Sequence, residues 1–229
     1  MVLWGFISVF MQQNSTWVAQ AAGVFIAAVL LWDVLFRGQL GVSVSFMEEM
    51  WSRNLGHLFT SPLRPVELAA ALTTMSLVRT LIGTVPAALL AIPLYHFNVF
   101  TLGLPLLAFF ANLLIMGWAL GLMLSGLILR YGQSAESLAW LAVFLLAPVS
   151  AIYYPVSILP WWLQQIAWAL PSAHVFEGMR AVLFQHVVRL DLLAYAAALN
   201  LVYMALGVAA FLYAVRLARR RGLFIQMGE

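Results

Sequence analysis

The chain has 229 residues, of which 65% are hydrophobic and only 8% are charged, and its formal net charge is +3. Its mean hydropathy of +0.99 excludes a soluble globular domain, since such domains carry about 25% charged residues, and predicts a single integral membrane domain over residues 1–229. The chain contains neither lysine nor cysteine, which excludes a P-loop ATPase, Schiff-base chemistry, thiol nucleophiles and cysteine metal sites. All basic residues are arginines dispersed along the expected membrane boundaries, a pattern that indicates topology rather than nucleic-acid binding.

The N-terminal region predicts one incomplete and one complete membrane span. Residues 1–11 are apolar but would cover only about 16 Å as a helix, roughly half of a bilayer, so we interpret them as the end of a truncated first span. The first complete span is expected from Trp17 to about Phe36. Asp33 and Arg37 stand four residues apart near its end, a spacing that predicts an ion pair at the membrane interface.

A polar segment follows, EEMWSRNLGHLFTSPLRPVEL from Glu48 to Leu68. Apolar residues recur through it and just before it at helical spacing, namely Met47, Trp51, Leu55 and Leu58. This predicts an amphipathic helix whose exposed apolar face needs a partner. Lipid is one candidate, but anionic lipid would repel the paired Glu48 and Glu49, so a protein partner is favoured.

Four further spans are expected along the rest of the chain: Thr80 to Phe97, Leu102 to Leu129, Leu138 to about Leu159, and about Leu192 to Val215. Arg79 is expected to snorkel at the membrane edge. Pro86 and Pro93 should kink the helix that follows it. Small residues at four-residue spacing, Gly117, Gly121 and Ser125, permit close helix packing, within the subunit or between subunits.

Two short helices are expected before the last span. The segment from Pro160 to Pro171, PWWLQQIAWALP, is too short to cross a bilayer, and its tryptophans suit the headgroup layer. The next segment carries charged and histidine side chains among apolar residues and reads as a second interfacial helix. Its ionisable residues are His174, Glu177, Arg180 and His186.

The distribution of arginine predicts the orientation. Four arginines crowd the C-terminal end of the last span, at positions 216, 219, 220 and 221, which predicts a cytoplasmic C-terminus. Counting back places the segment Glu48–Leu68 inside and the segment Pro160–Pro171 outside. With the truncated first span included, six spans result, and both termini are cytoplasmic.

Two segments of the chain resemble ABC type-2 transporter permeases. Glu48–Leu68 is similar to their cytoplasmic coupling segment, with an acidic residue, a short helix, a Ser/Thr-Pro and a second acidic residue. Tyr153–Leu183 is similar to their external stretch, in which a proline ends the fifth span, LPWWLQ begins a re-entrant helix, and Gly-x-Arg closes a second short helix. The order and spacing of both segments and the span count agree with this family over nearly the whole chain.

The resemblance implies an all-α, six-span bundle with a cytoplasmic coupling helix and a re-entrant external hairpin. It implies a bacterial inner-membrane permease that forms a homodimer in lipid and binds two cytoplasmic ABC ATPase subunits. ATP and Mg would be bound by the ATPase, so this chain would itself bind no cofactor and catalyse no reaction. Together the subunits would export a lipid-linked, glycan or drug-like molecule through a path between the two permeases.

The resemblance also assigns residues. The ATPase-coupling residues would be Glu48, Glu49, Trp51, Arg53, Asn54, Leu55, Leu58, Ser61 and Pro62. An external gate or substrate path would be lined by Tyr153, Tyr154, Trp161 and Trp162, although an interfacial aromatic belt is the alternative role for these rings. Family members usually begin with an amphipathic helix and a full first span. This chain is expected to begin within that span, so no gating role is assigned to an amphipathic helix.

Two other classes of function fit the sequence less well. A secondary transporter or channel without an ATPase partner predicts ionisable residues deep in several spans, whereas the only candidate, Asp33, is expected near a span end. An intramembrane enzyme needs a catalytic constellation, and the sequence contains no His-Glu-x-x-His motif,. A metal site at His174 and His186 with Glu177 between them is a minor alternative.

Overall fold

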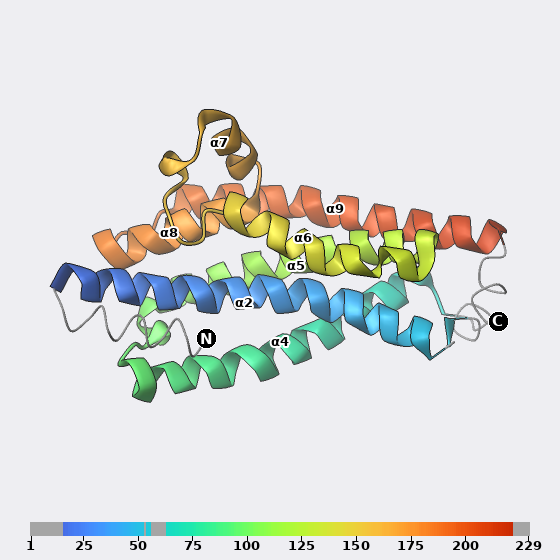
Figure 1. Cartoon of the computed structure of the whole chain (residues 1–229), viewed down its shortest axis with the longest axis horizontal. Coiled ribbons are helices and arrows are strands. Elements are labelled where there is room, and N and C mark those ends of the chain that lie inside the picture. The colour runs from blue at the N-terminus through green and yellow to red at the C-terminus, as the bar shows by residue number, and fades with distance from the viewer. Residues whose placement is uncertain (1–15, 53, 56–62, 222–229) are drawn as a thin grey trace.

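The computed structural model describes residues 16–52, 54–55 and 63–221, and within these ranges it is entirely helical (Figure 1). Four helices are long and apolar enough to cross a membrane. They are α2 (Thr16–Trp51), α4 (Pro65–Tyr95), α5 (Leu104–Tyr131) and α9 (Leu190–Arg221). Shorter elements connect them: η1 (Val99–Leu102), η2 (Gly132–Ala135), α6 (Glu136–Val149), η3 (Val156–Ile158), α7 (Trp161–Trp168) and α8 (Pro171–Gln185).

Helix α5 lies between α2 and α9, and α4 packs on the other side of α2. The predicted small-residue stripe explains the first contact. A Cβ atom on Gly117 would lie 2.8 Å from the Leu35 carbonyl oxygen, and one on Gly121 would lie 2.9 Å from that of Gln39. Because backbone cannot yield to a side chain cheaply, glycine allows α2 and α5 to touch. The stripe is therefore a contact within the subunit.

Helix α2 is much longer than the predicted span, since it continues from Phe36 to Trp51 without a break. The predicted pair does form: Arg37 Nε donates to Asp33 Oδ2 over 2.6 Å. It does not mark the end of the helix, because the residues that follow it, such as Phe46, are buried in the bundle. Asp33 lies at the middle of α2, and its predicted place near a span end stays a prediction.

Helix α6 is shorter than expected. It has 14 residues and ends at Val149, where a span to Leu159 was predicted; the chain then continues through a turn into η3. At about 1.5 Å per residue, α6 is roughly 21 Å long and does not cross a bilayer by itself. The total of six spans stays a prediction, with four span-length helices in the described ranges.

The two short helices before α9 are present, and prolines stand where each begins, as predicted. Helix α7 projects sideways from the bundle, in the half away from the C-terminus (Figure 1). Helix α8 is not interfacial, because most of its residues are buried where it packs against α9 and α5. The prediction of a second surface helix was therefore wrong for α8.

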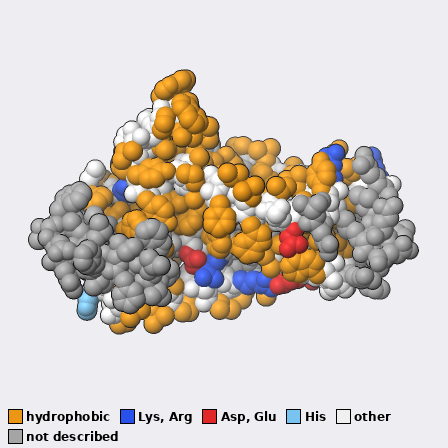
Figure 2. Space-filling model, in the orientation of Figure 1, with side chains coloured by type: hydrophobic (Ala, Val, Ile, Leu, Met, Phe, Trp, Pro, Cys, Tyr) orange, Lys and Arg blue, Asp and Glu red, His pale blue; other side chains and the backbone are white. Residues whose placement is uncertain are grey.

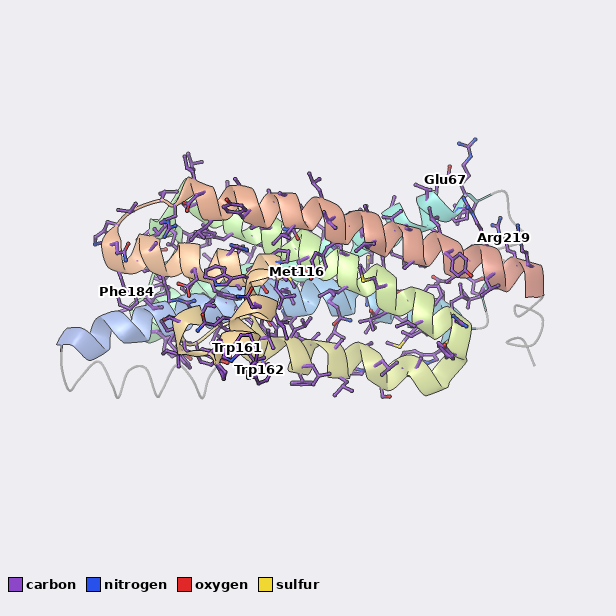
Figure 3. All side chains as sticks on the ribbon, turned by 90° about the horizontal axis from the view of Figure 1, so that it is seen from above. Glu67, Met116, Trp161, Trp162, Phe184 and Arg219 are labelled. Atoms are coloured by element: carbon purple, nitrogen blue, oxygen red, sulfur yellow. The ribbon has the colours of Figure 1, made fainter. Side chains whose placement is uncertain are left out.

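The two ends of the bundle differ in charge. We call the end where α2 stops and α4 begins the arginine-rich end; Glu67 and Arg219, which Figure 3 labels, both lie there. Its arginines in the described ranges are Arg64, Arg130, Arg216, Arg219, Arg220 and Arg221. The opposite part, which carries α7, α8 and the start of α9, is called the hairpin half.

Candidate functional site

The C-terminal end of α2 is built by short-range hydrogen bonds. The Asn54 side-chain amide donates to Glu49 Oε2 over 2.7 Å, and its backbone N–H donates to the Glu49 carbonyl oxygen over 3.0 Å. The backbone bond satisfies a carbonyl group that the helix end would leave unpaired, and the side-chain bond fixes Asn54 beside Glu49. On the other side of the connection, the Arg64 N–H donates to Glu67 Oε2 over 2.8 Å, which caps α4 and places an acidic side chain in its first turn.

The apolar residues predicted to form an exposed docking face behave differently from one another. Met47 and Leu55 are 1% and 3% exposed, and they pack in one hydrophobic cluster with Leu68 of α4 and Phe211 of α9. The prediction that these two side chains are exposed was wrong, because the subunit's own helices cover them. Trp51, in contrast, is 48% exposed.

Four of the predicted coupling residues lie outside the described ranges: Arg53, Leu58, Ser61 and Pro62. Of the remaining five, Glu49, Asn54 and Trp51 stand together at the helix end. Glu48 is engaged by α4, because Arg79 Nη2 donates to its Oε2 over 2.6 Å. The sequence suggested that Arg79 would snorkel, but it did not indicate this partner.

The loop after α6 is buried, although it has no regular secondary structure to pair its backbone. Ser150, Ala151 and Ile152 are at most 1% exposed, and Ala151 has a left-handed backbone with φ of 51°. Buried irregular backbone in a membrane protein needs polar partners from neighbouring elements. In this loop the polar partners come from α8.

Arg180 and Glu177 of α8 supply these partners. Arg180 Nη1 donates to the carbonyl oxygens of Ala151 at 2.9 Å and Ile152 at 3.3 Å. Glu177 Oε1 accepts the Val156 N–H over 2.7 Å and lies 3.0 Å from Arg180 Nη2. We call this set of contacts the Arg180 clamp. It ties the end of α6 to α8, and the Ser172–Ser150 hydroxyl contact of 2.9 Å supports it.

The four aromatic residues predicted for an external gate point in different directions. Tyr153 stacks on Phe25 of α2 with ring centroids 4.9 Å apart, and the Tyr154 hydroxyl donates to the Pro148 carbonyl oxygen. Trp161 and Trp162 are 77% and 52% exposed; they lie side by side on α7 in Figure 3. Figure 2 shows α7 as a hydrophobic projection.

A cavity of about 510 Å³ lies in the hairpin half. Its lining joins aromatic and charged side chains from η3, α7, α8 and α9. They include Trp168, Glu177, Arg180, Phe184 and Arg189. Outside the clamp, Arg189 is held by Asp191, whose carboxylate raises the pKa of the Arg189 guanidinium by hydrogen bonding. The cavity is thus amphipathic, a lining that suits a polar molecule with an apolar face.

A family model described as ABC-2 type transporter matches residues 1–184, which include the end of α2, the broken α6 and nearly all of α8. The chain belongs to the ABC-2 type transporter family. Comparison with curated proteins finds no match. As an ABC-2 membrane subunit, the chain is a transport component, and its four span-length helices place it in a membrane.

The histidines of this ABC-2 subunit do not assemble a metal site in the described ranges, where no group of three or more His, Asp or Glu side chains stands close enough to hold an ion. His174 instead lies against Trp168 and Tyr195, and its Nε2 is 2.9 Å from the Trp168 carbonyl oxygen. That contact fixes the Nε2–H tautomer when the ring is neutral. Burial lowers the pKa of His174 below its usual 6.5.

Sequence reasoning missed the Arg180 clamp and the contact of Arg79 with Glu48. Glu177 and Arg180 have the three-residue spacing of a helical ion pair, which was a detectable signal. Nothing in the sequence indicated that their partners were backbone groups of the loop after α6. The same holds for Arg79, whose partner Glu48 belongs to another helix.

Proposed function

We propose that this ABC-2 protein is the membrane-spanning subunit of an ATP-driven exporter, powered by separate ATPase subunits docked at the arginine-rich end. The observation that carries the proposal is the match of an ABC-2 family model to a chain without lysine. A P-loop needs its lysine to hold nucleotide phosphates. We therefore assign nucleotide hydrolysis to separate ATPase subunits.

The clustering of arginines supports a cytoplasmic arginine-rich end under the positive-inside rule. Trp51, Glu49 and Asn54 then face the compartment where ATP is found. Tryptophan is enriched among binding hot spots, and Trp51 is 48% exposed. We assign ATPase docking to this group, together with the coupling residues outside the described ranges.

In the proposed cycle, two permease subunits flank the substrate path and two ATPase subunits close on binding ATP. Closure pushes the end of α2 and shifts a pre-existing equilibrium towards an outward-open state. The cavity near Trp168 and Phe184 would then receive a glycan, lipid-linked or drug-like molecule on the hairpin side. A bacterial inner membrane is the location that fits this arrangement.

Co-purification tests the proposal. The tagged chain is co-expressed with candidate ABC ATPase subunits, and the complex is captured with and without a non-hydrolysable ATP analogue. Trp51→Glu should reduce ATPase recovery at least about ten-fold, as expected for loss of a hot-spot residue. Leu55 is unsuitable for this test, because a charge at that buried position would unfold the subunit.

Phe184→Glu is the matched control, since Phe184 is also 48% exposed but lies on α8 in the hairpin half. It should leave ATPase recovery unchanged. The alternative of a secondary transporter predicts that no ATPase is captured and that the purified chain transports unaided in liposomes. That pair of results would refute the proposal.

A further inference from the structure

The register of α5 against α9 is set by three contacts between the helices. The two residues of each contact are 88 positions apart: Asn112 with Asn200, Ala119 with Gly207, and Gly126 with Ala214. The helices therefore run parallel to each other, and their contact recurs every seven residues, as in a coiled coil. This regular spacing gives the level of every other residue along the seam between α5 and α9.

The register places the last arginine of α5 between two arginines of α9. Arg130 is level with Ala218, and Arg216 and Arg220 each stand two residues, or about 3 Å, from that level. All three arginine side chains are exposed. Packed helix axes are about 8–10 Å apart, so long side chains from both helices can reach one ligand. Figure 2 shows arginine side chains on the upper edge of the molecule at this end.

One side of the seam is filled and the other is open. Leu129 of α5 and Val215 of α9 are buried in one hydrophobic cluster, which fills the first side. Leu127 and Tyr213 each stand two residues before one of these positions, so they point to nearly the opposite side of their helices. They are 40% and 65% exposed. The open side of the seam is therefore bordered by Leu127 and Tyr213.

The arginines continue the open side towards the end of the bundle. Tyr213, Arg216 and Arg220 are spaced by three and four residues, which places them on one face of α9. On α5, the Arg130 guanidinium carbon lies 5.2 Å from the centroid of the Tyr131 ring. Stacking uses the flat face of a guanidinium, and its N–H groups stay available at the edge.

These arginines keep their charge unneutralised within the part of the chain that the structure describes. The ion pairs of the described residues involve none of Arg130, Arg216 and Arg220. Glu136, the acidic residue that follows Arg130 along the chain, stands in the first turn of α6 and belongs to none of these pairs. Three adjacent cations with free N–H groups suit a phosphate, which accepts several charge-assisted hydrogen bonds.

The same surface changes from apolar to charged within two helical turns. The uncharged stretch of α9 ends at Val215, and Tyr213 stands one turn before Arg216. Tyrosine rings are enriched at the level of lipid headgroups, and basic residues just beyond a span attract anionic lipid. A ligand of this surface needs an anionic head over the arginines and an apolar body along Leu127. A phospholipid has both parts, whereas an acidic protein surface lacks the apolar body.

We propose that the open side of the α5–α9 seam binds an anionic phospholipid from the leaflet at the arginine-rich end. Its phosphate lies on Arg130, Arg216 and Arg220, and one acyl chain lies along Leu127 and Tyr213. This lipid is a resident partner of the subunit and is not transported. The inference therefore does not depend on the proposed export function.

Native mass spectrometry of the full-length chain tests the proposal. The protein is released from nanodiscs that contain equal amounts of phosphatidylglycerol and phosphatidylcholine with identical acyl chains, and the lipids that stay bound are counted. The wild type should retain phosphatidylglycerol with at least about ten-fold preference, since each nearby arginine contributes about a factor of five. Arg130→Gln should lower the preference about five-fold, and the triple variant R130Q/R216Q/R220Q should abolish it.

Arg64→Gln is the matched control. Arg64 is exposed at the same end of the bundle, but it precedes α4, whose Leu68 belongs to the cluster on the filled side of the seam. The variant removes the same charge away from the open side, so it should keep the preference. The triple variant R130K/R216K/R220K retains the charges and should also keep it. A loss there would mean that the glutamine variants do not act through charge, which would contradict the proposal.

Three further results would overturn the proposal. An equal loss of preference in Arg64→Gln and Arg130→Gln would indicate a diffuse positive surface without a site. Displacement of the bound lipid by soluble glycerophosphoglycerol, as readily as by added phosphatidylglycerol, would indicate a site for a soluble phosphate ester. Unchanged lipid retention in R130Q/R216Q/R220Q, together with loss of ATPase capture, would assign the arginines to protein docking.

Discussion

Replacing Arg180 by methionine tests how the broken helix α6 is held. Methionine keeps much of the length and apolar stem of arginine but has no hydrogen-bond donor. The substitution leaves the carbonyl oxygens of Ala151 and Ile152 without their donor, and it leaves the Glu177 carboxylate in a largely buried position without a cation.

The expected loss of stability follows from that geometry. Arg180 is 8% exposed, and removing one partner of a buried ion pair costs about 3–5 kcal/mol. Each carbonyl group without a hydrogen-bond partner would add about 1–3 kcal/mol to the loss if no water reached it. Relaxation of the loop lets water bond to both carbonyl groups, which removes most of this extra cost. We expect about 3–5 kcal/mol in total.

Unfolding of the purified chain by SDS in mixed micelles, followed by circular dichroism, measures the change. Arg189→Met is the control, because Arg189 has a similar pair with Asp191 in which both side chains are about half exposed; no resolvable change is expected there. The variant R180M/E177L should recover part of the loss, since it leaves no buried charge unpaired. If R180M and R189M unfold alike, the clamp does not support the loop.

Two more predictions follow from the packing of α5 and α8. Gly117→Ala should destabilise the bundle by about 1–3 kcal/mol, because its methyl group would overlap backbone atoms of α2,; Gly126→Ala, whose Cβ atom would meet nothing closer than 3.3 Å, should have much less effect in the same unfolding assay. Burial lowers the pKa of His174, so the unfolded chain binds the proton more tightly than the folded chain does. The contribution of the neutral ring to the free energy of unfolding should be full above pH 6.5. It should fall as the pH drops through the folded pKa. Stability curves for His174→Gln that depend on pH between 7 and 5 as strongly as those of the wild type would contradict this assignment.

Local chemistry in the sequence was enough to predict the hairpin helices and the contact stripe. Pro160 and Pro171 bound α7 because proline suits a helix start and interrupts a preceding helix. Gly117 and Gly121 permit close packing wherever they meet a helix. The sequence left the partner open, and the structure identifies it as α2.

Two errors in the prediction, those on α6 and on the apolar face of the coupling segment, share one cause: contacts with residues distant in sequence decide which side chains are buried. Asp33 and Arg37 were read as a membrane boundary, and α2 continues past their ion pair to Trp51. The end of α6 at Val149 depends on Arg180, far along the chain. The spacing of Met47 and Leu55 indicated an apolar face, but it could not show that α4 and α9 cover it.

The short length of α6 has a mechanical consequence. One end of this helix follows η2 at the arginine-rich end, and its other end is fastened by the Arg180 clamp to α8 in the hairpin half. Because α6 is only about 21 Å long and is held at both ends, we expect a push along its axis to reach the loop that leads to α7. A shift of α6 along its own axis would thus displace α7 sideways from the bundle.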